Sequence, residues 1–155
     1  MDNPCQSASI VINRPPAEVY DMVADVTRMG EWSPVCTACW WDEGGGPRVG
    51  AMFTGRNEVP ERTWETRSEV VVADPGREIA WAVAEPPTRA RWSYLLTAVE
   101  GGTELTETWE LPPEGAAFFE QMFGDDAPKQ IGLRSEAAKN GIPATLAAIK
   151  KAAEA

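Results

Sequence analysis

Glu107 is the ionisable residue whose sequence neighbours most strongly suggest chemistry. Side chains alternate between the two faces of a strand, so Glu107 shares a face with the apolar residues Leu105 and Trp109. A carboxyl group on an apolar face must find a partner or acquire a raised pKa. Glu107 is therefore a candidate polar anchor or general acid–base group inside a cavity. The alternatives are pairing with Arg56 or Arg91 at a rim, or a bulge that turns the carboxyl towards water.

Tyr94 and Asn57 are the other polar residues expected on this face. The alternation around Tyr94 turns its phenol inward with Trp92, which makes Tyr94 a second candidate proton carrier. In the alternative interpretation, Tyr94 is a core residue that bonds to the backbone. Asn57 lies on the same face of its strand as Phe53, and its amide can form a hydrogen bond with a ligand carbonyl or hydroxyl. Asn57 would otherwise be a turn residue at the end of its strand.

The aromatic residues follow the same alternation and predict one Trp-rich face. The sequence holds seven Trp and no His, which favours an apolar binding site over His-driven catalysis or metal chemistry. Filling a core with several Trp residues is energetically costly, because each buried indole N–H needs a hydrogen-bond partner. The expected ligand-binding residues are Trp32, Trp41, Phe53, Asn57, Trp64, Trp81, Trp92, Tyr94, Glu107, Trp109, Phe119, Phe123, Ile142 and Leu146. The alternative is that these side chains simply fill a core.

Two short motifs are not expected to carry chemistry. Cys36 and Cys39 form a CxxC, but a spacing of three on a strand places the thiols on opposite faces. With no His and only Cys5 as a further thiol, we expect no metal site and no cofactor. The glycine-rich segment 44–50 precedes a strand, whereas a phosphate-binding loop precedes a helix. We expect a hairpin loop at the mouth of the pocket.

Composition excludes several classes of function. The chain has 155 residues, a formal net charge of −10 and a sequence pI near 4.5, so its surface should repel nucleic acid. No run approaches the roughly 20 apolar residues that a membrane helix needs, and the first residues do not resemble a secretory signal. Three Cys are too few for a disulfide scaffold. We expect a cytoplasmic protein that forms one domain over residues 1–155, with no integral membrane association.

The order of elements predicts the fold. A strand at 7–13 is followed by a helix that starts at Pro15-Pro16 and by a short helix capped by Asp25. Further strands are expected near 34–41, 51–58, 62–73, 77–84, 89–99 and 103–111, separated by turn signals. A short helix at 116–123 and a long helix from about residue 135 complete the chain. These elements predict an α+β fold in which a curved seven-stranded antiparallel sheet wraps the C-terminal helix and leaves a cavity.

Several segments resemble those of the START-like (SRPBCC) superfamily, which has the helix-grip fold of the birch pollen allergen. They are Arg14-Pro15-Pro16-Ala17-Glu18-Val19-Tyr20, Glu31-Trp32-Ser33-Pro34, Val49 to Asn57, Gly102 to Glu107 and Gly141 to Leu146. The chain is most similar to the polyketide cyclase/dehydrase-like subgroup, which is common in actinobacteria. The resemblance implies the helix-grip fold, and it is compatible with aromatase/cyclases, lipid carriers and hormone-binding proteins alike.

Three functional hypotheses follow. The first is binding of a small hydrophobic molecule, aromatic, polyketide-like or lipid-like, in a cavity between the sheet and the C-terminal helix. The second is an aromatase/cyclase that uses Glu107 or Tyr94 as its proton carrier. The third is a protein–protein interaction module, such as a homodimer formed through Trp40 and the apolar segment 118–123.

Overall fold

The computed structural model describes residues 3–155 and contains one seven-stranded antiparallel sheet. Its strands are β1 (Cys5–Ile12), β2 (Cys36–Trp41), β3 (Met52–Val59), β4 (Arg62–Asp74), β5 (Glu78–Glu85), β6 (Arg91–Val99) and β7 (Gly102–Glu110). The strand order is β1-β7-β6-β5-β4-β3-β2, so β2 to β7 form a meander and β1 closes it by pairing with β7. This is the predicted curved sheet of an α+β helix-grip-like fold.

Two short helices join β1 to β2, as predicted. The helix α1 (Pro16–Ala24) starts at a proline in its first turn and buries its face of Val19, Tyr20 and Val23. The 3₁₀ helix η1 (Val26–Glu31) follows directly, and the Asp25 side chain caps it by accepting a 3.1 Å bond from the Thr27 N–H. These helices bring Trp32 to the start of β2, where its side chain is buried.

The C-terminal part forms a helical hairpin. It consists of α2 (Pro113–Phe123), the short 3₁₀ turn η2 (Gly124–Asp126) and α3 (Ala127–Glu154). The expectation that the long helix starts near residue 135 is wrong, because Pro128 lies in the first turn of α3, where a missing N–H costs nothing. The three residues of η2 are thus the whole connection between α2 and α3.

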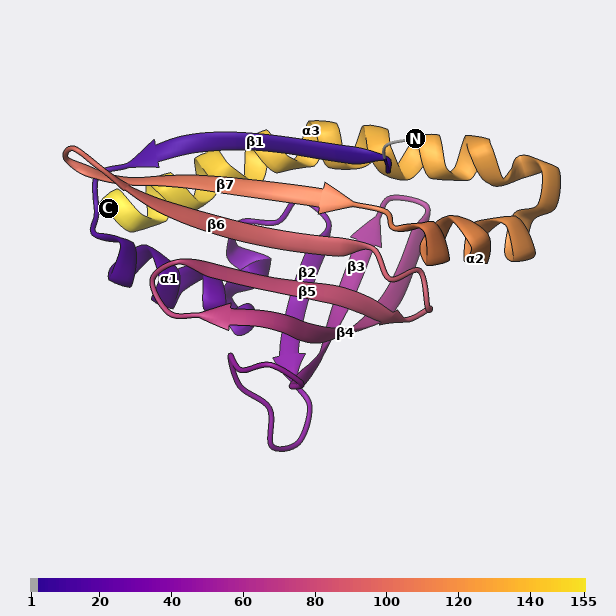
Figure 1. The fold of residues 1–155 in the computed structure, drawn as a ribbon, viewed down its shortest axis with the longest axis horizontal. Helices are drawn as coiled ribbons and strands as arrows, with labels where there is room; N and C mark the ends of the chain where they lie inside the picture. Colours follow the sequence, from indigo (N-terminus) through magenta and orange to yellow (C-terminus); the bar gives the residue numbers. More distant parts are fainter. Residues whose placement is uncertain (1–2) are drawn as a thin grey trace.

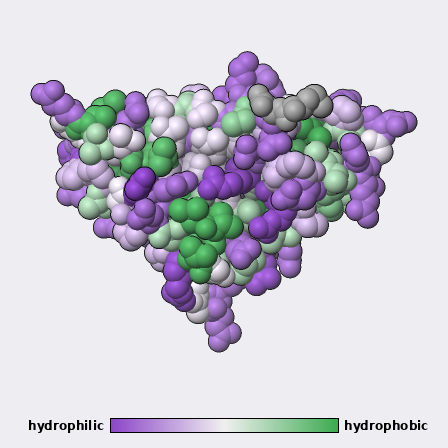
Figure 2. Space-filling model, in the orientation of Figure 1, coloured by the Kyte–Doolittle hydropathy of each residue, from purple (hydrophilic) through white to green (hydrophobic). Residues whose placement is uncertain are grey.

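The helix α3 covers the concave side of the sheet. It packs along β1 and also contacts β7, and Figure 1 shows it running beside β1 along the length of that strand. Its buried residues, Ala138, Ile142, Thr145, Leu146 and Ile149, recur at helical spacing and form the stripe that faces the sheet. The face of the molecule seen in Figure 2 is mainly hydrophilic, with hydrophobic residues confined to separate patches.

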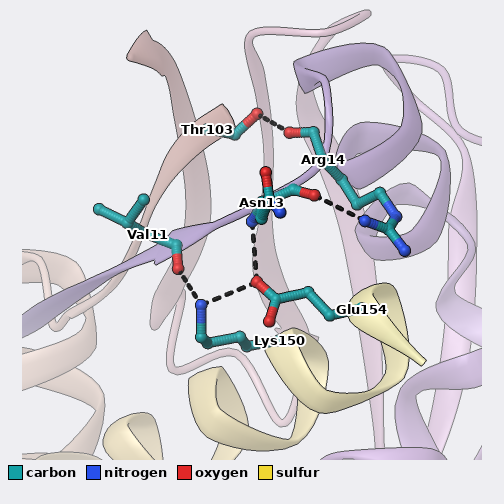
Figure 3. A network of polar contacts seen from close by, with 6 residues as sticks. All are labelled: Val11, Asn13, Arg14, Thr103, Lys150 and Glu154. Atoms are coloured by element: carbon teal, nitrogen blue, oxygen red, sulfur yellow. Dashed lines mark hydrogen bonds and ion pairs between the residues drawn. The ribbon is translucent and has the colours of Figure 1, made fainter. Parts of the chain in front are cut away.

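A polar network fixes the end of α3 to the end of β1 (Figure 3). The Lys150 ammonium donates a 2.6 Å bond to the Val11 carbonyl and lies 2.8 Å from the Glu154 carboxylate. The Glu154 carboxylate also accepts a 2.8 Å bond from the backbone N–H of Asn13. Through these contacts the last turn of α3 is held where β1 leads into α1.

We predict that Glu154→Gln lowers the thermal unfolding midpoint at pH 7. The Asn13 N–H and then Lys150 hold the pKa of the Glu154 carboxyl below its usual value of 4.5. A lowered folded-state pKa stabilises the protein above about pH 4.5, and this contribution disappears as the pH falls through the folded-state pKa. Melting curves at several pH values should therefore converge in acid. Glu136→Gln, at an exposed site on the same helix, serves as the control; an equal effect in both variants would contradict the prediction.

Candidate functional site

The structure places Glu107 inside the molecule. Along β7 the residues Thr103, Leu105, Glu107 and Trp109 are all buried, and Glu107 keeps only 4% of its surface exposed. The residues between them point to the other face and are exposed or half-buried. The alternation predicted from the sequence is thus present in the strand, and Glu107 lies on the concave face.

None of the alternatives for Glu107 is present in the structure. Arg56 pairs with Glu65 at 3.7 Å and Arg91 with Glu78 at 3.5 Å, so both arginines are engaged elsewhere. No bulge interrupts β7 at Glu107, which lies directly opposite Tyr94 on β6. Within residues 3–155, the Glu107 Oε1 atom is buried without a hydrogen-bond partner.

Burial changes the acid–base behaviour of Glu107 and Tyr94. Loss of solvent raises the pKa of the Glu107 carboxyl to about 8, and the nearby Tyr94 hydroxyl opposes this rise only in part. Burial, and then the adjacent Glu107, raise the pKa of the Tyr94 phenol well above its usual value. Near neutral pH, Glu107 therefore retains its proton in most molecules and can donate a hydrogen bond to a neutral oxygen acceptor.

Aromatic rings form a continuous row across the concave face and end beside Glu107. The ring centroids of Trp41 and Phe53 lie 5.6 Å apart, those of Phe53 and Trp81 5.5 Å, and those of Trp81 and Tyr94 5.9 Å. These distances are typical of edge-to-face and tilted aromatic contacts. The row therefore joins β2 to β6, where Tyr94 contacts the Glu107 carboxyl.

Three tryptophans form a second row on the same face. Trp81, Trp92 and Trp109 are paired across β5, β6 and β7. Trp81 and Trp109 are buried, and Trp92 is half-buried. Cross-strand neighbours of this kind lie close enough for their side chains to interact, so the indoles present one continuous apolar surface.

The residues expected to close the site come from three elements. Trp32, Phe119, Ile142 and Leu146 are buried, and they come from the residue after η1, from α2 and from α3. Phe123 differs, because 37% of its surface is exposed and its ring packs on Phe119 at 5.7 Å. Phe123 thus lies at the last turn of α2 against Phe119, and its contact with a ligand remains a prediction.

Asn57 and Trp64 occupy the far end of the concave face. They are paired across β3 and β4, and both are half-buried. The Asn57 amide donates a 3.3 Å bond to the Thr66 hydroxyl. Three strands, β4 to β6, lie between β3, which carries Asn57, and β7, which carries Glu107.

The expectation that Cys36 and Cys39 point to opposite faces is wrong. A register shift between Cys36 and Ala38 marks a bulge in β2, and the additional residue returns both thiols to one face. Both are buried, and their sulfur atoms lie 3.4 and 3.9 Å from the position that a Cβ on Gly55 would take. Contact between the thiols lowers the pKa of Cys36 and raises that of Cys39. The concave face thus carries a thiol pair next to Gly55.

The surface hollows of the described residues lie away from the candidate residues. One, of about 360 Å³, lies at the glycine-rich loop between β2 and β3 and is lined by polar residues that include Asp42 and Arg67. Another, of about 600 Å³, lies between Asn13–Pro16 and the β6–β7 turn. Neither of these two hollows is lined by the aromatic residues of the concave face. The expected place of this loop at the mouth of the pocket remains a prediction.

The residues that sequence reasoning missed are Arg62 and Arg134. Arg62 has the same parity on β4 as Trp64, and its guanidinium lies 4.1 Å from the Trp64 ring centroid. Arg134 lies one helical turn before the buried Ala138, and its guanidinium lies 5.8 Å from the Phe119 ring. The alternation of strand faces could have identified Arg62, and the helical spacing from Ala138 could have identified Arg134.

Several apolar side chains are exposed away from the concave face. Trp40 is 39% exposed on the outer side of β2, as its parity predicts, while Met122 and Leu133 expose apolar side chains on the helical hairpin. A homodimer through Trp40 and residues 118–123 remains a prediction.

Within residues 3–155, no helix is long and apolar enough to span a membrane, and no group of three His, Cys, Asp or Glu side chains is arranged to hold a metal.

Comparison with known proteins identifies the family. Residues 5–153 match the family model described as polyketide cyclase/dehydrase and lipid transport. The chain belongs to this family. It is also similar to the solution structure of the Polyketide_cyc-like protein Cgl2372 from Corynebacterium glutamicum, with 51% identity, a TM-score of 0.70 and coverage of 98% of this chain and 92% of that one. No curated protein sequence gave a match.

Two solved structures of lower sequence identity share the fold. The di-domain ARO/CYC protein StfQ of the steffimycin pathway is 16% identical, with a TM-score of 0.73 and coverage of 99% of this chain and 51% of that one. BexL, the di-domain ARO/CYC protein of the BE-7585A pathway, is 19% identical, with a TM-score of 0.71 and coverage of 97% and 50%. The chain thus spans about half the length of either protein. Family and fold together support a ligand-binding or cyclase role.

We predict that Glu107→Gln changes the pH dependence of stability. Because folding raises the Glu107 pKa from 4.5 to about 8, this residue's contribution to stability is fully present below pH 4.5 and declines as the pH rises to about 8. Relative to wild type, the variant should gain on the order of 5 kcal/mol in unfolding free energy between pH 4 and pH 9. Urea unfolding across this range measures the difference, and Glu104→Gln on the exposed face of the same strand is the control. A pH-independent difference would show that Glu107 titrates normally.

Proposed function

We propose that the protein binds a small hydrophobic molecule, aromatic, polyketide-like or lipid-like, between the concave face of the sheet and α3. The observation that carries the proposal is Glu107, whose buried Oε1 has no partner within residues 3–155. Leaving a buried polar atom unsatisfied costs about 1–3 kcal/mol. A ligand hydroxyl or carbonyl beside Glu107 would remove this cost.

The surroundings of Glu107 favour a ligand with an aromatic or otherwise flat apolar body. The ring of Tyr94 lies beside the carboxyl, and the row through Trp81 and Phe53 continues from it across the sheet. Burial of apolar ligand surface against these rings contributes about 25 cal/mol per Å². The protonated Glu107 carboxyl would then select a ligand with an oxygen acceptor at one end of that body.

Gly55 leaves additional space on the same face. It lies on β3 between Phe53 and Asn57, and a Cβ there would make ordinary contacts of 3.4–3.9 Å with the nearest side-chain atoms. The buried glycine thus leaves the sheet without a side chain beside the thiol pair. Because Phe53, Trp81, Tyr94 and Trp109 on this face are buried, uptake of a ligand would require α2, α3 or the β3–β4 hairpin to move outward.

The first test is native mass spectrometry of the protein purified from its own host and from a foreign one. We expect a defined additional mass that is lost on denaturation, with the released molecule identified from the denatured extract. Glu107→Leu should carry less of this molecule, because the carboxyl is replaced by a side chain that makes no hydrogen bond. A clean ligand-free mass from both hosts, together with no binding of an apolar probe, would refute the proposal.

The second test distinguishes an open site from a filled core. If the space beside Gly55 accepts a ligand, Gly55→Leu should weaken binding of the neutral probe N-phenyl-1-naphthylamine at least about tenfold while changing the unfolding free energy by less than about 1 kcal/mol. Fluorescence titration and urea unfolding measure the two effects, and Thr97→Leu on the exposed face of β6 is the control. A loss of stability of about 2–3 kcal/mol, with no probe binding in the wild type, would indicate a filled core.

The raised pKa of Glu107 favours one further function, an aromatase/cyclase acting on a poly-β-ketone chain. A pKa of about 8 lies close to physiological pH, where a carboxyl group can both accept and return a proton. In this mechanism the Glu107 carboxylate would remove a proton from the carbon between two carbonyls, and Tyr94 would hydrogen-bond to the oxygen that gains charge. The adjacent positions of the two residues on β6 and β7 support this assignment of roles.

Binding and catalysis are separable in one variant. If Glu107 moves the proton, Glu107→Gln should lower the cyclisation rate by at least about 100-fold while the dissociation constant for the same ketide changes less than threefold. Tyr94→Phe, which removes only the hydroxyl, should reduce the rate less. Single-turnover product analysis and fluorescence titration provide the two measurements. Equal losses of rate and affinity in Glu107→Gln would exclude this catalytic role.

A further inference from the structure

Arg134 occupies an unusual position for a charged residue. It lies on α3 in line with Ala138 and Ile142, one and two turns further along the stripe that faces the sheet. Its side chain is half-buried, and its guanidinium lies 5.8 Å from the Phe119 ring centroid. Desolvation lowers the pKa of Arg134. The chain thus places a permanent cation at a position where the rest of the helix places apolar residues.

Arg62 approaches the same end of the site from the sheet. It is the first residue of β4, and its guanidinium lies 4.1 Å from the ring centroid of Trp64, two residues along the same face. Its positive charge further lowers the pKa of Arg134, so the two guanidinium groups are close enough to repel each other. Arg62 lies at the β3–β4 hairpin and Arg134 on α3, so the two charges come from different parts of the fold.

Neither cation is neutralised within the described chain. Among residues 3–155, Arg62 and Arg134 take part in no ion pair, which is also true of Arg14, Arg48 and Arg77, whereas Arg28, Arg56, Arg67, Arg89 and Arg91 each pair with a carboxylate. The protein carries a net charge of −10, so acidic partners are abundant in the sequence. Two neighbouring cations without an acidic partner are electrostatically unfavourable and leave a local positive site.

We propose that Arg62 and Arg134 form an anion-binding site at the entrance to the concave face, and that the natural ligand is amphipathic. Its anionic group, a carboxylate, sulfonate or phosphate, lies between the two guanidinium groups, while its apolar body extends past Trp64 and Phe119 towards the aromatic rows. This inference rests on the proposed function and adds the charge of the ligand. Guanidinium groups suit this task, because they donate several hydrogen bonds to an oxyanion and stay protonated.

The test compares two fluorescent probes that differ in a single group. 8-Anilinonaphthalene-1-sulfonate and N-phenyl-1-naphthylamine share their ring systems, and only the first carries a sulfonate. In the double variant Arg62→Gln/Arg134→Gln, affinity for the sulfonate probe should fall about tenfold or more, and affinity for the neutral probe should change less than twofold. Raising the salt concentration should reduce the preference of the wild type for the anionic probe.

Two further variants make the result specific. Arg56→Gln removes an exposed arginine that already pairs with Glu65 on the outer face, and it should leave both affinities unchanged. Arg134→Lys keeps the charge and should retain most of the preference for the sulfonate. Unchanged affinity of the double variant for the neutral probe also shows that the site is intact.

The outcomes separate this inference from the proposal on which it rests. If the wild type binds the neutral probe but its affinity for the sulfonate probe does not depend on Arg62 and Arg134, the anion site is refuted and the hydrophobic site stands. Equal loss of both probes in the double variant also refutes the anion site, because the arginines would then act only through packing. If the wild type binds neither probe, both proposals are refuted.

Discussion

The seven-stranded sheet has one aromatic face that must be kept from water, and the rest of the structure follows from how α3 covers it. Alternation along the strands gathers large rings on the concave face, and burial of a large aromatic or aliphatic side chain contributes about 1.5–3 kcal/mol. The helix has to stay against β1 to exclude solvent, and the Lys150 and Glu154 contacts with the end of β1 hold its last turn there. Trp32 and Phe119 complete the cover from the two ends of the sheet.

The same alternation that builds the core brings Glu107 into it, at a cost in stability near and above neutral pH. A Gln or Leu at this position would avoid ionisation, so the carboxyl is better explained by a function than by packing. Its neighbour Tyr94 adds a second polar group beside Glu107. Further along the face, the thiol pair and the small residue Gly55 fill less space than the tryptophan row. Sites that bind small molecules commonly combine such an apolar wall with a few polar groups.

Sequence reasoning predicted the features that depend on strand periodicity. The face of Glu107, the buried rings and the outward position of Trp40 follow from a period of two, and the antiparallel arrangement of the sheet follows from the turn signals between successive strands. It failed where the chain leaves that period or where distant elements meet. The bulge at Cys36 reversed the expected face of a thiol, and the start of α3 lay before rather than after Pro128. The approach of Arg62 to Arg134 depends on how two hairpins pack, which no local pattern records.

The central claim is that the concave face receives a ligand, and the seven tryptophans provide a direct measurement. Each indole N–H gives its own signal in a ¹⁵N-correlated NMR spectrum, and N-phenyl-1-naphthylamine can be titrated while these signals are followed. The account predicts shifts for Trp81, Trp92, Trp109 and Trp64 on the concave face, with Trp40 on the outer face unchanged. Shifts confined to Trp40, or no shifts at probe concentrations that saturate its fluorescence, would contradict it.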